Sequence, residues 1–311
     1  MRPSAGRVAP SLAAALECVT VADDCRRASV GGRQIEASGT AELAHRLGHA
    51  IYEVLHVGWP TQPADKIRTS TDEDFERRLL AATPHASVVR TASVAAADGT
   101  QVFVELDGVR VVIPRAEAGE PGPPGGPLAV RLPSFRPALS PGYWMADGTR
   151  ALAAGDRILR LYVHLTTPAA AVAAWAAVLA MLEERGVAFR AKVTSVPALL
   201  TRRDGLVVYA GSADLAAVLT IARRIGDMTP VGQEVSVFTE RVGPGVAVAW
   251  EPSDRRPAMR GLSFGEHRAR ATAEGLVRHA GSNDGSTAAE SVRLALAEAG
   301  IDPAHPARNL P

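Results

Sequence analysis

Residues 158–165 read Ile-Leu-Arg-Leu-Tyr-Val-His-Leu, with apolar and polar residues in alternation. This pattern is typical of a β-strand with one buried face. Because successive strand side chains point to opposite faces, Arg160, Tyr162 and His164 are expected to share one face. Strand residues two positions apart are separated by roughly 6–7 Å, so these three polar side chains could reach one small anionic group.

The strand-like run 189–193 carries the second basic residue of interest. The chain has 34 lysine and arginine residues, and only Lys66 and Lys192 are lysines. Arginine keeps its proton at any working pH, whereas burial and nearby positive charge can turn a lysine into a base. Lys192 is therefore a candidate base. A lysine retained by chance, with its amine in water, would give the same pattern.

The composition indicates an ordinary globular protein of 311 residues, with 47% hydrophobic and 22% charged residues. The net charge is only +1, so neither a nucleic acid nor a membrane is expected as a partner. The N-terminus is too polar for a signal peptide. The longest apolar run, 169–182, has 14 residues and is too short to span a bilayer. These features predict a cytoplasmic protein.

No metal or cofactor site is indicated. Cys18 and Cys25 match no metal-binding or redox spacing, which favours structural or incidental roles. His45 and His49 have the i, i+4 spacing of a metal-binding pair. No motif such as H-E-x-x-H accompanies them, so solvated or capping histidines are favoured.

Residues 1–127 are expected to form an N-terminal portion of helices and hairpins. One or two helices should occupy 1–39, and Thr40 should cap a helix at 41–57. A further helix is expected at 72–82. The expected strands are 86–89, 101–106 and 109–113, with tight turns at the Asp-Gly pairs 98–99 and 107–108.

Residues 128–311 are expected to form the catalytic portion, after a loop rich in proline and glycine at 114–127. Thr167-Pro168 should begin a helix that ends at Arg185, before Gly186. The other expected elements are strands at 189–193, 206–210, 234–238 and 245–250, helices at 213–225 and 266–280, and a helix opened by a capping box at Thr287. The mixture predicts an α+β fold, with a largely antiparallel sheet flanked by helices in one compact unit.

Several segments in a fixed order resemble the Hop-A type III effector family, whose domain also occurs as a standalone protein in peptide-modification gene clusters. The segments are Leu132-Pro133, Ser140-Pro141-Gly142-Tyr143, Arg160-Leu161-Tyr162, Phe189-Arg190-Ala191-Lys192, Arg203-Asp204-Gly205-Leu206-Val207-Val208-Tyr209, Phe238-Thr239, Gly245 to Pro252, Ser263 to Arg268, and the ending from Gly300 to Pro311. The resemblance covers about residues 40–311. Its specificity lies in the ordered series and not in any one motif.

That family is similar in turn to the phosphothreonine lyases typified by OspF and SpvC, which implies a phosphothreonine-lyase-like core. The resemblance implies a lyase that eliminates phosphate from phosphoserine and phosphothreonine in a precursor peptide. The products would be dehydroalanine and dehydrobutyrine, as in class V lanthipeptides and thioamitides. A separate Ser/Thr kinase of the same pathway would phosphorylate the peptide, and no cofactor would be needed.

The resemblance places the lysine base of these lyases on Lys192 and their histidine acid on His164. The base must be an uncharged amine, and the acid should begin protonated, which a phosphate dianion beside it favours. Arg203 corresponds to the first phosphate-binding arginine and could bind the phosphate bidentately. A buried structural histidine is the alternative for His164.

Five further residues are candidates. Tyr209 could orient the phosphate or the substrate carbonyl, or could be an ordinary tyrosine at the core edge. Arg268 could form a second phosphate clamp with Arg241 near a helix N-terminus, with a surface role as the alternative for Arg241. The lyases have a phosphate-binding lysine two residues before the acid, where this chain has Tyr162. Arg160, on the same face, could replace it.

Two other functions remain open from the sequence. One is a non-catalytic adaptor that binds a phosphopeptide or a leader peptide in the same basic pocket and partners a kinase. The other is a secreted effector that acts on a host kinase, although no segment resembles an export signal.

Overall fold

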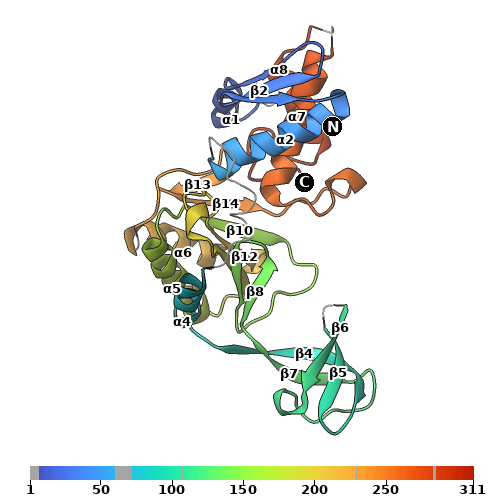
Figure 1. Cartoon of the computed structure of the whole chain (residues 1–311), viewed down its shortest axis with the longest axis vertical. Coiled ribbons are helices and arrows are strands. Elements are labelled where there is room, and N and C mark those ends of the chain that lie inside the picture. Colours follow the sequence, from blue (N-terminus) through green and yellow to red (C-terminus); the bar gives the residue numbers. More distant parts are fainter. Residues whose placement is uncertain (1–6, 60–71, 107, 229, 283–284) are drawn as a thin grey trace.

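Three antiparallel β-sheets, with helices around two of them, make up the part of the chain that the computed structural model describes, residues 7–59, 72–106, 108–228, 230–282 and 285–311. Figure 1 shows them in three tiers. A small sheet with the N-terminal and C-terminal helices forms one end, a seven-stranded sheet lies in the middle, and a four-stranded lobe forms the other end. This confirms the predicted α+β class with antiparallel sheets flanked by helices.

The seven-stranded sheet has the order β13-β14-β10-β12-β11-β9-β8, so the alternating stretch at residues 158–163 is an interior strand next to the middle strand β12. All neighbouring strands in it run antiparallel. The strands are β8 (Phe135–Ser140), β9 (Tyr143–Asp147), β10 (Ile158–Val163), β11 (Phe189–Thr194), β12 (Leu206–Gly211), β13 (Glu240–Gly243) and β14 (Val246–Trp250).

One face of this sheet is covered by α4 (Glu73–Ala81), α5 (Pro168–Glu184) and α6 (Leu215–Met228) (Figure 1). Leu161 and Val163 of β10 pack there with the fully buried Trp175 of α5. α5 begins as predicted, because the Thr167 side chain accepts a hydrogen bond from the backbone N–H of Ala170 and Pro168 is the first helical residue.

The opposite face packs against α2 (Thr40–Ile51), the π-helix η1 (Tyr52–Val57) and α7 (Phe264–Ala280). Tyr162 and Val207 of the sheet belong to this second core together with Phe264. Gly265 allows a close approach, because a Cβ there would lie 2.2 Å from the His56 ring. η1 and the start of α7 therefore meet directly above the central strands.

The remaining elements complete the two ends. α1 (Pro10–Leu16), β1 (Val19–Val21), β2 (Arg27–Val30), β3 (Arg33–Glu36) and α8 (Ala288–Glu298) lie with α2 and α7. β4 (Ser87–Ala97), β5 (Gln101–Leu106), β6 (Val109–Pro114) and β7 (Pro127–Pro133) form the lobe, in the order β6-β5-β4-β7. Short 3-10 helices occur at η2 (Arg115–Glu117), η3 (Pro197–Leu199), η4 (Ser212–Asp214) and η5 (Pro257–Met259).

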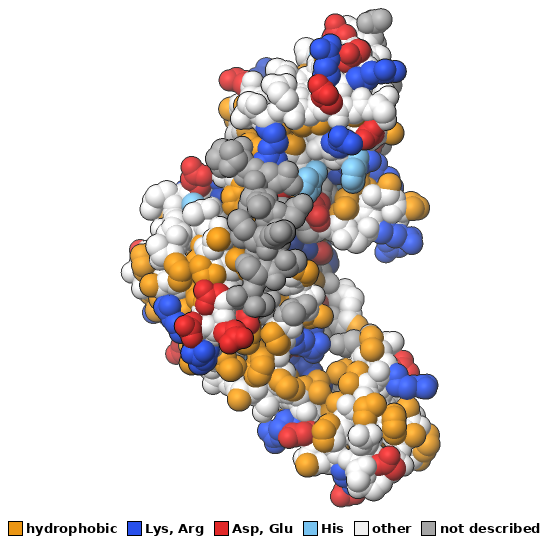
Figure 2. Space-filling view, in the orientation of Figure 1, with side chains coloured by type: hydrophobic (Ala, Val, Ile, Leu, Met, Phe, Trp, Pro, Cys, Tyr) orange, Lys and Arg blue, Asp and Glu red, His pale blue; other side chains and the backbone are white. Residues whose placement is uncertain are grey.

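The lobe stands apart from the rest of the molecule, and Figure 2 shows hydrophobic side chains on its visible face. Val89, Val109 and Val112 are among its exposed apolar residues. The boundary expected between 127 and 128 falls at the start of β7. That strand pairs with β4 along residues 127–133, so the lobe contains residues from both expected portions.

Most predicted elements are confirmed, and three predictions are wrong. Residues 19–36 form three strands where one or two helices with a loose, glycine-containing connection were expected, because Gly31 and Gly32 adopt positive φ and turn β2 into β3. Residues 234–238 form no strand. Gly39, and not Thr40, is the N-cap of α2, which winds into η1 at its end.

Asp107 of the second expected Asp-Gly turn, the other lysine Lys66 and the chain start lie outside the described residues. Among the described helices, none combines the length and the hydrophobicity needed to cross a bilayer.

Candidate active site

Neighbouring strands bring four of the expected site residues to one face of the central sheet. Tyr162 of β10 lies opposite Val207 of β12, which lies opposite Lys192 of β11. Two residues away along the same two strands, Arg160 of β10 lies opposite Tyr209 of β12. Residues in register across a sheet point to the same face, as do residues two apart along a strand. Lys192, Tyr162, Arg160 and Tyr209 therefore share the face that packs on η1 and α7.

His164 extends the same face beyond the end of β10, since its backbone N–H still donates to the carbonyl of Gly245. Lys192 and His164 are two strands apart and two residues apart along the strand direction. With strands ~4.8 Å apart and ~3.3 Å per residue, their Cα atoms are separated by about 12 Å.

The amine of Lys192 lies 4.1 Å from the ring centroid of Tyr143. Within the described part of the chain, no residue makes a hydrogen bond or an ion pair with this amine. The side chain is half-buried. The stacked ring therefore holds the amine in place but leaves its nitrogen available to a substrate.

His164 is buried, and its Nδ1 accepts a hydrogen bond from the backbone N–H of Glu234 at 3.3 Å. Burial lowers the pKa of this histidine, the Arg203 charge lowers it further, and the Glu234 charge opposes both. The unliganded protein thus favours a neutral imidazole, and a bound phosphate dianion would raise its pKa. Gly232 is required beside it, because a Cβ there would lie 2.2 Å from Nδ1.

The guanidinium of Arg203 binds the exposed carboxylate of Glu234 next to His164 through Nε and Nη2, which are called the fork of Arg203 below. Its Nε and Nη2 donate to Oε2 of Glu234 at 3.0 and 2.7 Å, and its Nη1 donates to the carbonyl of Leu55. The Glu234 side chain is 62% exposed, so it can swing away into solvent. An anion of the substrate could then take its place on the fork.

Arg160 is a buried anchor more than an open phosphate ligand. It makes two hydrogen bonds with Glu251, and its guanidinium lies 4.9 Å from the ring centroid of Tyr209. Tyr162 is also buried, which raises the pKa of its hydroxyl, and it packs edge-on against His56.

Arg268 is fully buried and holds the C-terminal segment. It donates to the carbonyl of Pro306 at 3.0 Å and to Oδ1 of Asn309 at 2.7 Å, and burial lowers its pKa to about 9. Arg241 is exposed on β13 and donates to the carbonyl of Gln233. The two arginines have different partners, and no contact joins them among the described residues.

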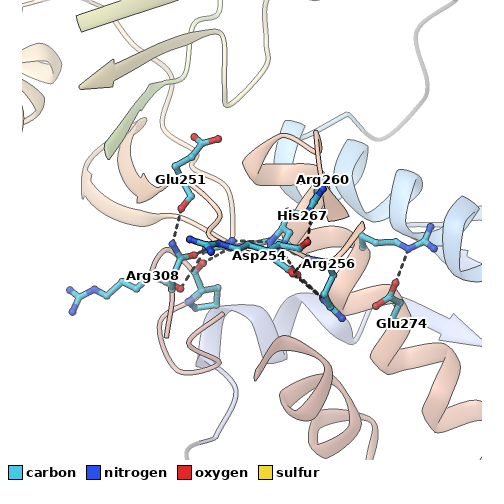
Figure 3. Close-up of polar contacts among 12 residues, drawn as sticks. Glu251, Asp254, Arg256, Arg260, His267, Glu274 and Arg308 are labelled. Atoms are coloured by element: carbon cyan, nitrogen blue, oxygen red, sulfur yellow. Dashed lines mark hydrogen bonds and ion pairs between the residues drawn. The ribbon is translucent and has the colours of Figure 1, made fainter. Parts of the chain in front are cut away.

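The N-terminus of α7, the expected helix end of the second clamp, is already capped by the protein. Ser263 and Glu266 form a capping box there. Figure 3 shows Asp254 between His267 and Arg256, and Asp254 accepts from them at 3.1 and 2.7 Å. The charges around this helix start are therefore paired internally.

The family model described as the HopA1 effector protein family matches residues 134–308. The chain belongs to the HopA1 effector protein family.

Two solved structures of effector proteins are similar to it. The first is the effector protein from Pseudomonas syringae pv. tomato strain DC3000, with 13% sequence identity and a TM-score of 0.50; the match covers 87% of this chain and 96% of that chain. The second is the effector protein from Pseudomonas syringae pv. syringae strain 61, with 14% sequence identity and a TM-score of 0.49; the match covers 87% of this chain and 93% of that chain. At this identity the likeness shows the fold alone. No curated protein matches the chain.

Sequence reasoning missed a buried polar cluster that joins the HopA1-matched sheet to η1, outside the match. Arg202 donates to both carboxylate oxygens of Asp204, at 2.7 and 2.9 Å, and to the hydroxyl of Tyr52 at 3.2 Å. His56 lies 3.9 Å from Asp204, and its Nδ1 is 2.8 Å from Oγ of Ser236. Burial lowers the pKa of His56 to about 4.

This cluster fixes the segment 202–204, which carries the fork of Arg203, against η1. Two features of the sequence pointed to it weakly. Tyr52 and His56 are spaced i, i+4 on the expected helix, and an acidic residue follows two adjacent arginines at 202–204. Neither pattern shows that the two segments meet.

His45 and His49 do not form a metal pair with each other. His45 accepts from Arg270 at 2.9 Å, and His49 lies 3.3 Å from Glu53. Across the described residues, no group of three or more histidine, cysteine, aspartate or glutamate side chains is placed to hold a metal ion.

Proposed function

We propose that this member of the HopA1 family is a phosphoserine/phosphothreonine lyase that converts a phosphorylated precursor peptide to dehydroalanine or dehydrobutyrine. The observation that carries the proposal is the arrangement of Lys192 and His164. They share one side of the central sheet, Lys192 has an accessible amine, and the arginine fork of Arg203 lies beside His164.

The chemistry assigned to these groups is a β-elimination. Lys192 takes the Cα proton, the electrons of that C–H bond form the Cα–Cβ double bond, and the Cβ–O bond breaks. The phosphate leaves with the electrons of that bond and takes a proton from His164. Arg203 neutralises the growing negative charge on its oxygens. The products are the dehydrated peptide and inorganic phosphate, and the step requires no cofactor.

The test is the mass of a phosphothreonine peptide incubated with the protein and a metal chelator. We expect a product lighter by one phosphoric acid. Recovery of unmodified threonine would indicate hydrolysis and would exclude elimination. Binding without any mass change would favour the alternative, a phosphopeptide- or leader-peptide-binding adaptor that partners the kinase.

A second expectation concerns Glu234, whose carboxylate occupies the fork of Arg203. Replacing it with glutamine, Glu234→Gln, removes the competing charge, so phosphopeptide binding should tighten by about two- to fivefold, the range of an exposed ion pair. The dissociation constant can be measured by fluorescence anisotropy at fixed ionic strength.

The matched control is Glu240→Gln, which breaks a similarly exposed pair with Arg308. It should leave the affinity unchanged. Weaker binding by the Glu234→Gln protein would show that the phosphate does not use this fork.

A further inference from the structure

A cavity of about 140 Å³ lies where the lobe meets the central sheet, and three arginines line it. They are Arg90 from β4, Arg136 from β8 and Arg190 from β11, and Asp147 at the end of β9 is the one acidic residue of the lining. The remaining walls are largely apolar, with Leu106, Leu152 and Phe189 among them. The lining therefore carries more positive than negative charge. Its apolar walls strengthen ionic contacts, because they lower the local dielectric constant.

Arg136 and Arg190 both lie beside the carboxylate of Asp147. Nε of Arg190 donates to Oδ1 of Asp147 at 2.7 Å. Nη2 of Arg136 lies 2.9 Å from Oδ2 of the same carboxylate, yet that oxygen has no hydrogen-bond partner among the described residues. Arg136 thus contributes charge here without a well-oriented hydrogen bond. The side chains of Arg136 and Arg190 are 34% and 40% exposed, so both can be reached from solvent.

Asp147 is a buried acceptor that needs a donor. Its side chain is only 6% exposed, and a buried carboxylate oxygen that accepts no hydrogen bond is costly even beside a positive charge. A free anion would satisfy the arginines but would supply no donor for Oδ2. A peptide supplies both, because its acidic side chain can bind the arginines and its backbone N–H can donate to Asp147.

The cavity also continues the line of the proposed active site. Arg190 is two residues before Lys192 on β11 and therefore points to the same face of the sheet. Arg136 lies opposite Met145, which lies opposite Lys192. From His164 to Lys192 the path crosses from β10 over β12 to β11, and from Lys192 it continues along β11 to Arg190. A peptide whose phosphate lies at His164 would continue past Lys192 into the cavity.

We propose that this cavity is a subsite for an acidic residue of the peptide substrate, a few residues from the phosphorylated one. The inference rests on the proposed function for the direction of the peptide. Its chemistry is the pairing of one carboxylate with Arg136 and Arg190. The lobe contributes to it through Arg90, whose guanidinium donates to the carbonyls of Gly148 and Thr149 and so holds the 148–149 turn beside the cavity.

The test uses pairs of phosphothreonine peptides, and the two peptides of a pair differ only in having glutamate or glutamine at one position. In successive pairs this position lies two, three or four residues before or after the phosphothreonine. Binding is measured by fluorescence anisotropy on the Lys192→Ala protein, which leaves the peptide intact. At one position the glutamate peptide should bind about tenfold more tightly, as expected for charge-assisted hydrogen bonds. Arg136→Gln and Arg190→Gln should each reduce this preference and leave affinity for the glutamine peptide unchanged.

Arg110→Gln, on the outer strand β6 and outside the cavity lining, is the matched control and should keep the preference. The melting temperature of each variant is compared with that of the wild-type protein, to check that the fold tolerates Asp147 with only one of its two arginines. Equal binding of the glutamate and glutamine peptides at every position, or binding of neither, would overturn the subsite. Failure of the wild-type protein to eliminate phosphate would instead overturn the proposed function, since the binding preference does not depend on turnover.

Discussion

Replacement of Lys192 by alanine is expected to lower the rate of phosphate elimination by about 10²- to 10⁴-fold, the usual contribution of a positioned general base. Two side chains of the proposed site can exchange a proton with the substrate, and because His164 is assigned the role of acid, the amine of Lys192 is the base. The arginines nearby keep their protons at any working pH. Elimination can be followed by mass spectrometry or by phosphate release.

Affinity for the phosphopeptide should change little in the same variant, because Arg203 remains in place. Lys192→Arg is the informative control, since it keeps the positive charge but cannot accept a proton. It should be as inactive as the alanine variant. A Lys192→Arg protein that retains activity would show that Lys192 supplies charge and that another group takes the Cα proton.

The sequence predicted the central sheet because the relevant information is local. Alternation in 158–165 identified β10 and the face of Arg160 and Tyr162, and the Thr167-Pro168 cap fixed the start of α5. The face shared with Lys192 follows once the strands pair in register. Local sequence patterns were therefore sufficient to predict which side chains lie on the same face of the sheet.

The partners of the charged residues could not be predicted, because they come from distant segments. Arg160 pairs with Glu251, Arg203 pairs with Glu234, and Arg268 holds the chain end. A sequence pattern shows an arginine but not which carboxylate it meets. This is why Arg268 looked like a phosphate ligand and proved to be fully buried.

The expected strand at 234–238 failed for a related reason. Its apolar residue Phe238 is fully buried, but the segment is held by irregular contacts, with Ser236 bonded to His56 and the backbone of Glu234 bonded to His164. Alternation alone does not separate a strand from a loop whose side chains are anchored alternately. These tertiary contacts override the local β preference.

The buried pair of Arg202 and Asp204 should dominate the stability of this region. Arg202→Ala is expected to lower the free energy of unfolding by about 3–5 kcal/mol, because it leaves a buried carboxylate without its cation. Both side chains are more than nine-tenths buried. Arg278→Ala, which breaks an exposed pair with Glu298, should cost less than about 1 kcal/mol. Chemical denaturation of the three proteins measures both effects.

The pH dependence identifies the cause of that loss. In the wild-type protein, burial acts to raise the pKa of Asp204, but the charge and hydrogen bonds of Arg202, together with other nearby positive charge, lower it overall. The pair therefore stabilises the fold above about pH 4 and loses its effect as the pH falls further. Without Arg202, burial instead raises the pKa of Asp204, and protonation then stabilises the variant as the pH falls. The difference in unfolding free energy should therefore shrink from pH 7 to pH 4.5. A difference that stays constant would assign the loss to the packing of Arg202 between Trp59 and Tyr143 and not to its charge.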